Sequence, residues 1–182
     1  MRSGSEVYDL QQDKDVRQLK FYFRSSGDRR VLKIIGYSFL GQMMGKDLYN
    51  LGFGDIDRKN NCIIDHLATG NGDVYKVLNT VLSTIPLFFE NFRDAILMVK
   101  GSDGSPAFSE WCRLTCRKHC EQHCRNANRR IKIYRGYVNK YFKELCVEYQ
   151  FLGEYRDRHQ QVVQEAYQPH RDYEAVFLFK KA

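Results

Sequence analysis

The side chains with the most evident chemistry are four cysteines and two histidines that crowd into one short stretch of the chain. They are Cys112, Cys116, His119, Cys120, His123 and Cys124, with the cysteines at every fourth position. Residues four positions apart on a helix lie one turn above another, so each adjacent cysteine pair can share a metal ion. Thiolate and imidazole are common ligands of Zn²⁺ in tetrahedral sites. The spacing therefore predicts a zinc site built from these cysteines, with His119 and His123 as alternative ligands.

A single metal site containing all four cysteines cannot form on one continuous helix. On one continuous helix, Cys112 and Cys124 would lie roughly 18 Å apart along the axis, beyond the reach of one ion. The segment must then fold back, and residues 119–122 are the place that we predict. A second option is a mixed site made of Cys116, His119, Cys120 and His123. Without a metal, the cysteines form a packed helix face or a redox switch whose thiolates are favoured by neighbouring cations.

The formal net charge of +7 is concentrated in the same part of the chain. Residues 111–135 contain eight Lys and Arg residues against Glu121 alone, and the rest of the chain is balanced. Such a patch attracts phosphates, nucleic acid or an acidic protein, whereas a solvated helix face is the alternative interpretation. Phe108, Trp111 and Tyr134 lie beside the patch, where they either stack on bases or anchor the segment to the core. The cations that we predict at the binding surface are Arg113, Arg117, Lys118, Arg125, Arg129 and Arg130.

The composition fits one globular domain that spans residues 1–182. The chain is 43% hydrophobic and 14% aromatic, and its length is sufficient to bury a substantial core. Its N-terminus lacks the apolar region of a signal peptide, and its apolar runs are too short to cross a bilayer. We therefore expect a cytoplasmic protein with no membrane partner. In a reducing compartment the six cysteines are thiols or metal ligands rather than disulfides.

The elements that must position these residues are predicted to form an α+β domain with a largely antiparallel sheet. After a polar arm, short apolar runs separated by turns indicate a four-strand meander. The predicted strands are residues 20–24, 31–40, 47–57 and 62–68. Four side chains in or beside this meander are candidate ligands for a divalent cation: Asp55, Asp57, Asp65 and His66.

The second half of the chain is predicted as helix, strand, helix and two closing strands. Apolar residues recur at helical spacing from Val74 to Ile85, with Asp73 as N-cap and Pro86 as a kink or an end. The later elements are a strand over 95–99, helices over 107–125 and 129–146, and strands over 148–155 and 173–180. Two stretches stand apart from them, a Cys/His-rich basic insert over 103–128 and a polar excursion over 156–171.

Several motifs occur in order along the chain and carry a family resemblance. They are Asp47–Asp55, Gly72–Val81, the pair Gly101-Ser102, Arg130 with Tyr134-Arg135, and Tyr173–Phe177. Together they resemble an uncharacterised domain-of-unknown-function family that is typical of Bacteroidota. The resemblance covers residues 20–102 and 129–180, and it implies no activity. It also implies that the Cys/His-rich segment is an insertion into the family scaffold.

The order of the predicted elements is similar to that of the GNAT acyltransferase superfamily. In that superfamily a glycine turn at a helix N-terminus binds the pyrophosphate of acetyl-CoA through backbone N–H groups. The resemblance puts Gly70, Asn71 and Gly72 at this turn, and Tyr134 at the position of a general acid. However, Asp73 adds a carboxylate where the phosphates would lie. The sequence therefore argues against acetyl-CoA as a cofactor.

Two classes of function are consistent with these patterns. The first is an intracellular binding module whose basic, zinc-supported insert contacts nucleic acid or an acidic partner. The second is an enzyme, either a GNAT-like acyltransferase or its degenerate relative, or a small nuclease of the toxin type. The sequence contains no complete catalytic motif, so it favours the binding module and leaves open whether the protein is an enzyme.

Overall fold

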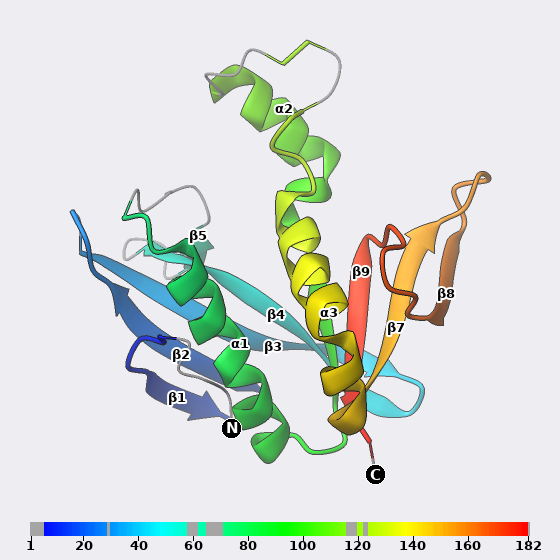
Figure 1. Ribbon diagram of the computed structural model, residues 1–182. Helices are drawn as coiled ribbons and strands as arrows, with labels where there is room; N and C mark the ends of the chain where they lie inside the picture. The colour runs from blue at the N-terminus through cyan, green and yellow to red at the C-terminus, as the bar shows by residue number, and fades with distance from the viewer. Residues whose placement is uncertain are drawn as a thin grey trace. The chain divides into compact units, whose positions relative to one another are not determined.

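The computed structural model describes residues 6–28, 30–57, 62–64, 71–115, 120–121 and 124–181 (Figure 1). The fold is α+β with antiparallel strand pairs, as predicted. The chain divides into two compact units, Met1–Ala95 (unit 1) and Ile96–Ala182 (unit 2). No helix in the described part of the chain is long and apolar enough to cross a membrane.

Unit 1 contains the predicted meander. Its strands are β1 (Gln11–Asp15), β2 (Gln18–Ser25), β3 (Val31–Met43), β4 (Lys46–Asp57) and β5 (Cys62–Ile64). Each strand pairs antiparallel with the next, so the meander is confirmed. Strand β1 extends it into the stretch that was predicted as a polar arm. All five residues of β1 are exposed, which is why no alternating apolar pattern marked this strand.

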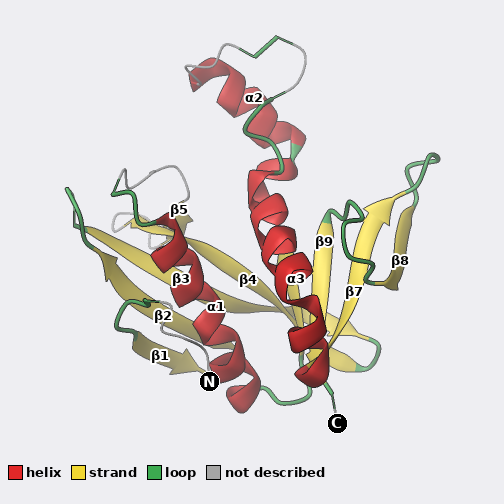
Figure 2. Ribbon diagram, viewed as in Figure 1, coloured by secondary structure: helices red, strands yellow, loops and turns green. Residues whose placement is uncertain are grey.

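Helix α1 (Val74–Asn91) covers one face of this sheet (Figure 2). The sheet contributes alternate side chains to the core, such as Phe21 and Tyr37, which are at most 1% exposed. The Tyr37 ring stacks on Phe88 of α1 at 4.7 Å between centroids, and its hydroxyl lies 2.6 Å from Thr84 Oγ1. The helix continues past Pro86, so this proline does not end it. Burial of Phe88 and Phe89 beyond the proline offsets the lost backbone hydrogen bond.

Unit 2 is built from antiparallel strands and two helices. Its elements are β6 (Ile96–Lys100), a short 3₁₀ turn η1 (Ser102–Gly104), α2 (Pro106–Thr115), α3 (Arg129–Glu148), β7 (Tyr149–Arg156), β8 (Val162–Ala166) and β9 (Ala175–Lys180). The last strand, β9, lies between β6 and β7, and β8 pairs with the free side of β7. Helix α3 packs on β6, β7 and β9, with Ile131 and Val138 buried on that side.

Two predicted boundaries in unit 2 differ from the structure. The helix predicted over 107–125 ends at Thr115, and residues 120–121 and 124 are not helical. Strand β8 and the buried Tyr167 lie within residues 156–171, the predicted polar excursion. In β8 the half-buried positions alternate with exposed ones, so only a weak apolar pattern marked it.

Candidate functional site

The described residues just before α3 lie against α2. Residues 125–128 form a turn in which the Ala127 N–H donates to the Cys124 carbonyl at 3.0 Å. Asn128 ends this turn in the left-handed conformation, with a φ of 58°, which asparagine adopts more readily than most residues. As a result, Cys112, Cys120 and Cys124 line a single hollow of about 430 Å³. A break in the helix is what a shared cysteine site requires.

Asp103 anchors the start of α3 from 27 positions earlier in the chain. It is only 3% exposed, and its carboxylate accepts a hydrogen bond from the Arg130 N–H at 3.0 Å. Its backbone carbonyl accepts a second one from the Asn128 N–H at 3.1 Å. A Cβ at Gly101 would lie 2.7 Å from Asp103 Oδ1 and 3.2 Å from the Ile131 nitrogen, so this close approach requires glycine.

Three of the four predicted cysteine ligands lie in the described part of the chain, where none of the three is in a disulfide. The Asn126 side-chain amide donates to Cys112 Sγ at 3.3 Å, and the Arg125 backbone N–H donates to Cys120 Sγ at 3.4 Å. Cys116, His119 and His123 lie outside the described residues. Among the residues that are described, no three His, Cys, Asp or Glu side chains converge as metal ligands. Zinc at this segment therefore stays a prediction.

Exposed cations are the clearest feature of residues 111–135. Arg113, Arg125, Arg129 and Lys132 are exposed, and no ion pair involves them within the described residues. Arg113 and Lys132 line the hollow that the cysteines share. Glu121, also exposed, is the acidic residue of the segment. The predicted surface residues Arg117 and Lys118 lie outside the described part of the chain. We call Arg113, Arg125, Arg129 and Lys132 the exposed cation group.

Two other cations of residues 111–135 are directed inward. Arg130 is half-buried, and burial lowers the pKa of its guanidinium while the nearby Tyr134 raises it. Arg135 forms an ion pair with Asp172 and donates to the Tyr173 carbonyl at 3.1 Å, so it holds unit 2 together. Burial raises the pKa of Tyr134 to about 12, which Arg130 opposes by attraction and Asp103 reinforces. Tyr134 is therefore protonated at neutral pH.

The solvent face of α3 continues beyond residue 135 with two lysines and two glutamates, so it adds no net charge there. Its exposed positions are Arg129, Lys132, Ile133, Gly136, Lys140, Lys143, Glu144, Val147 and Glu148. Because these positions recur every three or four residues, they lie along one side of the helix. Sequence reasoning missed Lys140 and Lys143, because the charge excess was counted along the chain and these lysines stand among apolar and acidic neighbours. The helical period from Arg129 onward is the signal that would have included them.

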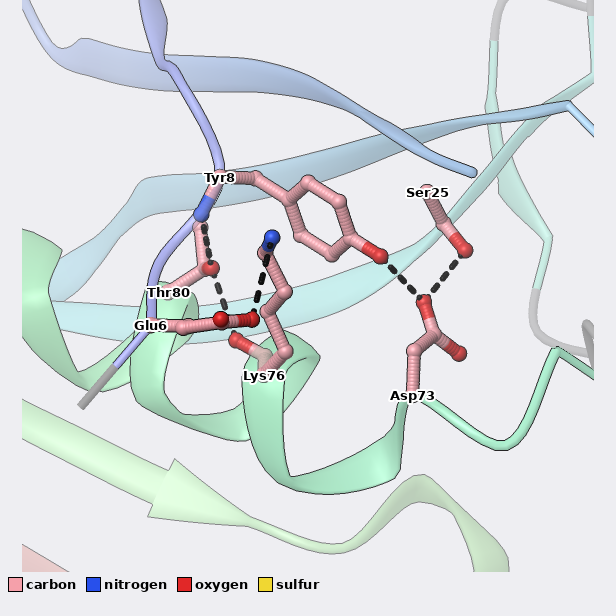
Figure 3. Close-up of polar contacts among 6 residues, drawn as sticks. All are labelled: Glu6, Tyr8, Ser25, Asp73, Lys76 and Thr80. Carbon is pink, nitrogen blue, oxygen red and sulfur yellow. Dashed lines mark hydrogen bonds and ion pairs between the residues drawn. The ribbon is translucent and has the colours of Figure 1, made fainter. Parts of the chain in front are cut away.

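A second polar cluster lies at the start of α1 in unit 1 (Figure 3). Asp73 occupies the predicted N-cap position, but its side chain makes no capping hydrogen bond to the helix. Instead, Asp73 Oδ2 accepts hydrogen bonds from the Tyr8 hydroxyl at 2.8 Å and the Ser25 hydroxyl at 2.5 Å. Ser25 is fully buried, and it also accepts one from the Asn71 side-chain amide at 2.9 Å. The carboxylate thus joins α1 to β2 and to the N-terminal segment.

The same cluster holds the N-terminal segment against α1. The Tyr8 N–H donates to Thr80 Oγ1 at 2.9 Å, and the Lys76 ammonium lies 4.5 Å from the centre of the Tyr8 ring. Lys76 also pairs with Glu6 at 3.5 Å. Gly72 has a φ of 68°, whereas Gly70 lies outside the described residues. The candidate cofactor turn is therefore described at Asn71 and Gly72, and the contacts around it link parts of unit 1.

A buried ion pair in unit 1 had no counterpart in the sequence analysis. Lys33 and Asp55 face each other across β3 and β4, with 2.5 Å between Lys33 Nζ and Asp55 Oδ1. Their side chains are 7% and 5% exposed. Asp55 was a candidate cation ligand, but in the structure its partner is this lysine. Asp65 and His66, two other candidates for that cation, lie outside the described residues.

Comparison with known proteins assigns the chain to a family. A model of a family of unknown function, DUF6934, matches residues 4–107. The match spans β1 to β6 and ends within α2, so it does not include residues 129–180, which were predicted to resemble the family. Comparison with curated proteins and with solved structures found no significant match. Because the match covers more than half of the chain, and because an uncharacterised family was predicted from the motifs, we conclude that this protein belongs to DUF6934, a family of unknown function.

Proposed function

We propose that the protein is a nucleic-acid-binding module and that the exposed cation group, on α2, on α3 and in the turn between them, is its interface. The observation that carries the proposal is the exposed cation group, whose members have no acidic partners within the described residues. Unpaired surface cations attract the phosphate backbone over a range of about one Debye length, roughly 8 Å at physiological salt. Each cation that contacts a phosphate releases condensed counterions, which is a major source of affinity.

The way in which these cations are held also supports the proposal. Arg129 and Lys132 stand in the first turn of α3, whose start is fixed by the buried Asp103. Arg113 stands on α2, and the Asn126–Cys112 contact tethers this helix to the turn before α3. Cations on anchored helices need little ordering when a ligand binds, so less conformational entropy is lost. An interface of this kind lies outside the region that the family model matches.

A salt titration tests the proposal. Labelled nucleic acid of about 20 nucleotides is bound at salt concentrations from about 50 to about 200 mM, and Kd is measured by fluorescence polarisation. Four phosphate contacts predict that the logarithm of the association constant falls with the logarithm of salt with a slope of about −3. Absence of binding at the lowest salt would overturn the proposal. Tighter binding of poly-glutamate than of nucleic acid would also overturn it, because the interface would then serve an acidic protein.

A second candidate function is acyl transfer, with Tyr134 at the position of the general acid. Burial raises the pKa of this phenol to about 12, which keeps it protonated at neutral pH but weakens it as a general acid, because an effective general acid has a pKa near the operating pH. The element order of the chain also resembles that of the GNAT superfamily. If this candidate is right, saturating acetyl-CoA should raise the Tm, since a ligand at 100 times its Kd stabilises the native state by about 2.7 kcal/mol. An unchanged Tm in about 1 mM acetyl-CoA removes this candidate.

A further inference from the structure

We infer that the nucleic acid recognised by this protein is duplex DNA and that the exposed face of α3 is the element that lies in its major groove. This inference rests on the proposed function, and it adds to it the class of nucleic acid and the element that contacts it.

Four positions of α3 form a row along one side of the helix. Arg129, Lys132, Gly136 and Lys140 follow one another at intervals of three, four and four residues, so all four lie on one side of the helix. All four positions are exposed. At 1.5 Å per residue the row is about 16 Å long, and it precedes the local distortion at Tyr141. A straight positive edge of this length runs parallel to the helix axis.

The opposite face of α3 is fixed. Ile131 and Val138 are buried, and the helix packs on β6, β7 and β9. Asp103 holds its first turn, and Arg135 ties it to Asp172. The row is therefore presented on a rigid element, as groove recognition by a helix requires.

A glycine lies in the middle of the row. Gly136 has no side chain, and a Cβ placed there would have no neighbour within 4 Å. The helix backbone can thus approach a ligand closely at this point, while the cations on either side reach past it. Ile133 lies beside Gly136 on the same face and is 43% exposed. An exposed aliphatic side chain among cations is suited to the methyl group of thymine, which lines the major groove.

The exposed face of α3 suits duplex DNA better than it suits single strands or duplex RNA. Single strands are held by aromatic side chains on which the bases stack, and none of the exposed positions of α3 is aromatic. Trp111, which is 42% exposed, is two positions from Arg113 on α2, so the two side chains point to different faces. The major groove of duplex RNA is too deep and narrow for a helix, whereas that of B-DNA is about 12 Å wide and admits one.

Gly136→Glu is the decisive variant. It puts a carboxylate into the middle of the row, its Cβ would have no neighbouring atom within 4 Å, and it replaces glycine with a better helix former. The control is Gln150→Glu, which makes the same charge change at an exposed position of β7. Kd is measured for duplex DNA, duplex RNA and single-stranded DNA of one sequence at one salt concentration, and the Tm of each variant is recorded.

We expect wild-type protein to bind duplex DNA at least tenfold tighter than the other two nucleic acids. Gly136→Glu should weaken duplex binding at least tenfold without lowering the Tm, and Gln150→Glu should leave Kd nearly unchanged. Equal affinity for single strands and duplex DNA overturns the inference, as does a Gly136→Glu variant that binds like wild type. Either result leaves the proposed function standing if binding still falls steeply with salt. If wild-type protein binds none of the three, the proposed function itself has failed.

Discussion

Replacing Lys33 with methionine is expected to lower the free energy of unfolding by about 3 to 5 kcal/mol. The substitution keeps the length of the side chain but removes its charge, which leaves Asp55 ionised and only 5% exposed on the core side of β4. In the described part of the chain, no other side chain forms an ion pair or a hydrogen bond with that carboxylate. Because small domains are stable by only about 5 to 15 kcal/mol, such a loss is readily measured by urea denaturation.

The double variant Lys33→Met, Asp55→Leu separates the ion pair from the volume that it fills. With both charges removed, most of the lost stability should return, because apolar groups often replace a buried pair at little cost. Lys46→Met serves as a control at an exposed position of β4 and should change stability by less than about 0.5 kcal/mol. A Lys33→Met protein within about 1 kcal/mol of wild type would show that the pair is not desolvated as the structure indicates.

Reversing two charges of the exposed cation group should have the largest effect on ligand binding. Arg113→Glu combined with Arg125→Glu is expected to weaken nucleic-acid binding about 100-fold at physiological salt, roughly tenfold for each lost phosphate contact. The slope of the logarithm of the association constant against the logarithm of salt should become shallower by about 2. Both side chains are exposed, so the Tm of the variant should stay close to that of wild type.

The matched control reverses two arginines outside the interface. Arg93→Glu with Arg158→Glu makes the same change in net charge at two other exposed positions. We expect this control to weaken binding only severalfold, through the long-range field of the whole protein. If the two double variants lose equal affinity, binding follows net charge alone, and the exposed cation group is not the interface.

Local patterns in the sequence were sufficient for the fold class and for most of the elements. The meander and α1 follow from apolar residues that alternate or recur every three to four positions, and such patterns need only neighbours along the chain. Strand β1 lacked any pattern because all of its residues are exposed. The concentration of charge in residues 111–135 was likewise evident from composition alone.

The candidate site was only partly predictable, because several of its contacts join residues that are distant in the sequence. Cys112 of α2 and Cys124, twelve positions later, line the same hollow. Neither the helical spacing of the cysteines nor their number indicated which pairs would meet. Asp73 was correctly predicted at the start of α1, but Tyr8 and Ser25 compete successfully for its carboxylate.

By itself, the sequence determined the α+β class, the membership of an uncharacterised family and the presence of one strongly basic segment, since each of these is a property of local composition or pattern. Only the tertiary structure decided which charges are exposed and which are used internally. Arg135 forms an ion pair with Asp172, and Lys33 forms one with Asp55. Lys140 and Arg129, in contrast, are both exposed on the solvent face of α3. The physical reason is that strand register and helix packing bring together partners far apart in the sequence, and burial then makes the Lys33–Asp55 pair obligatory.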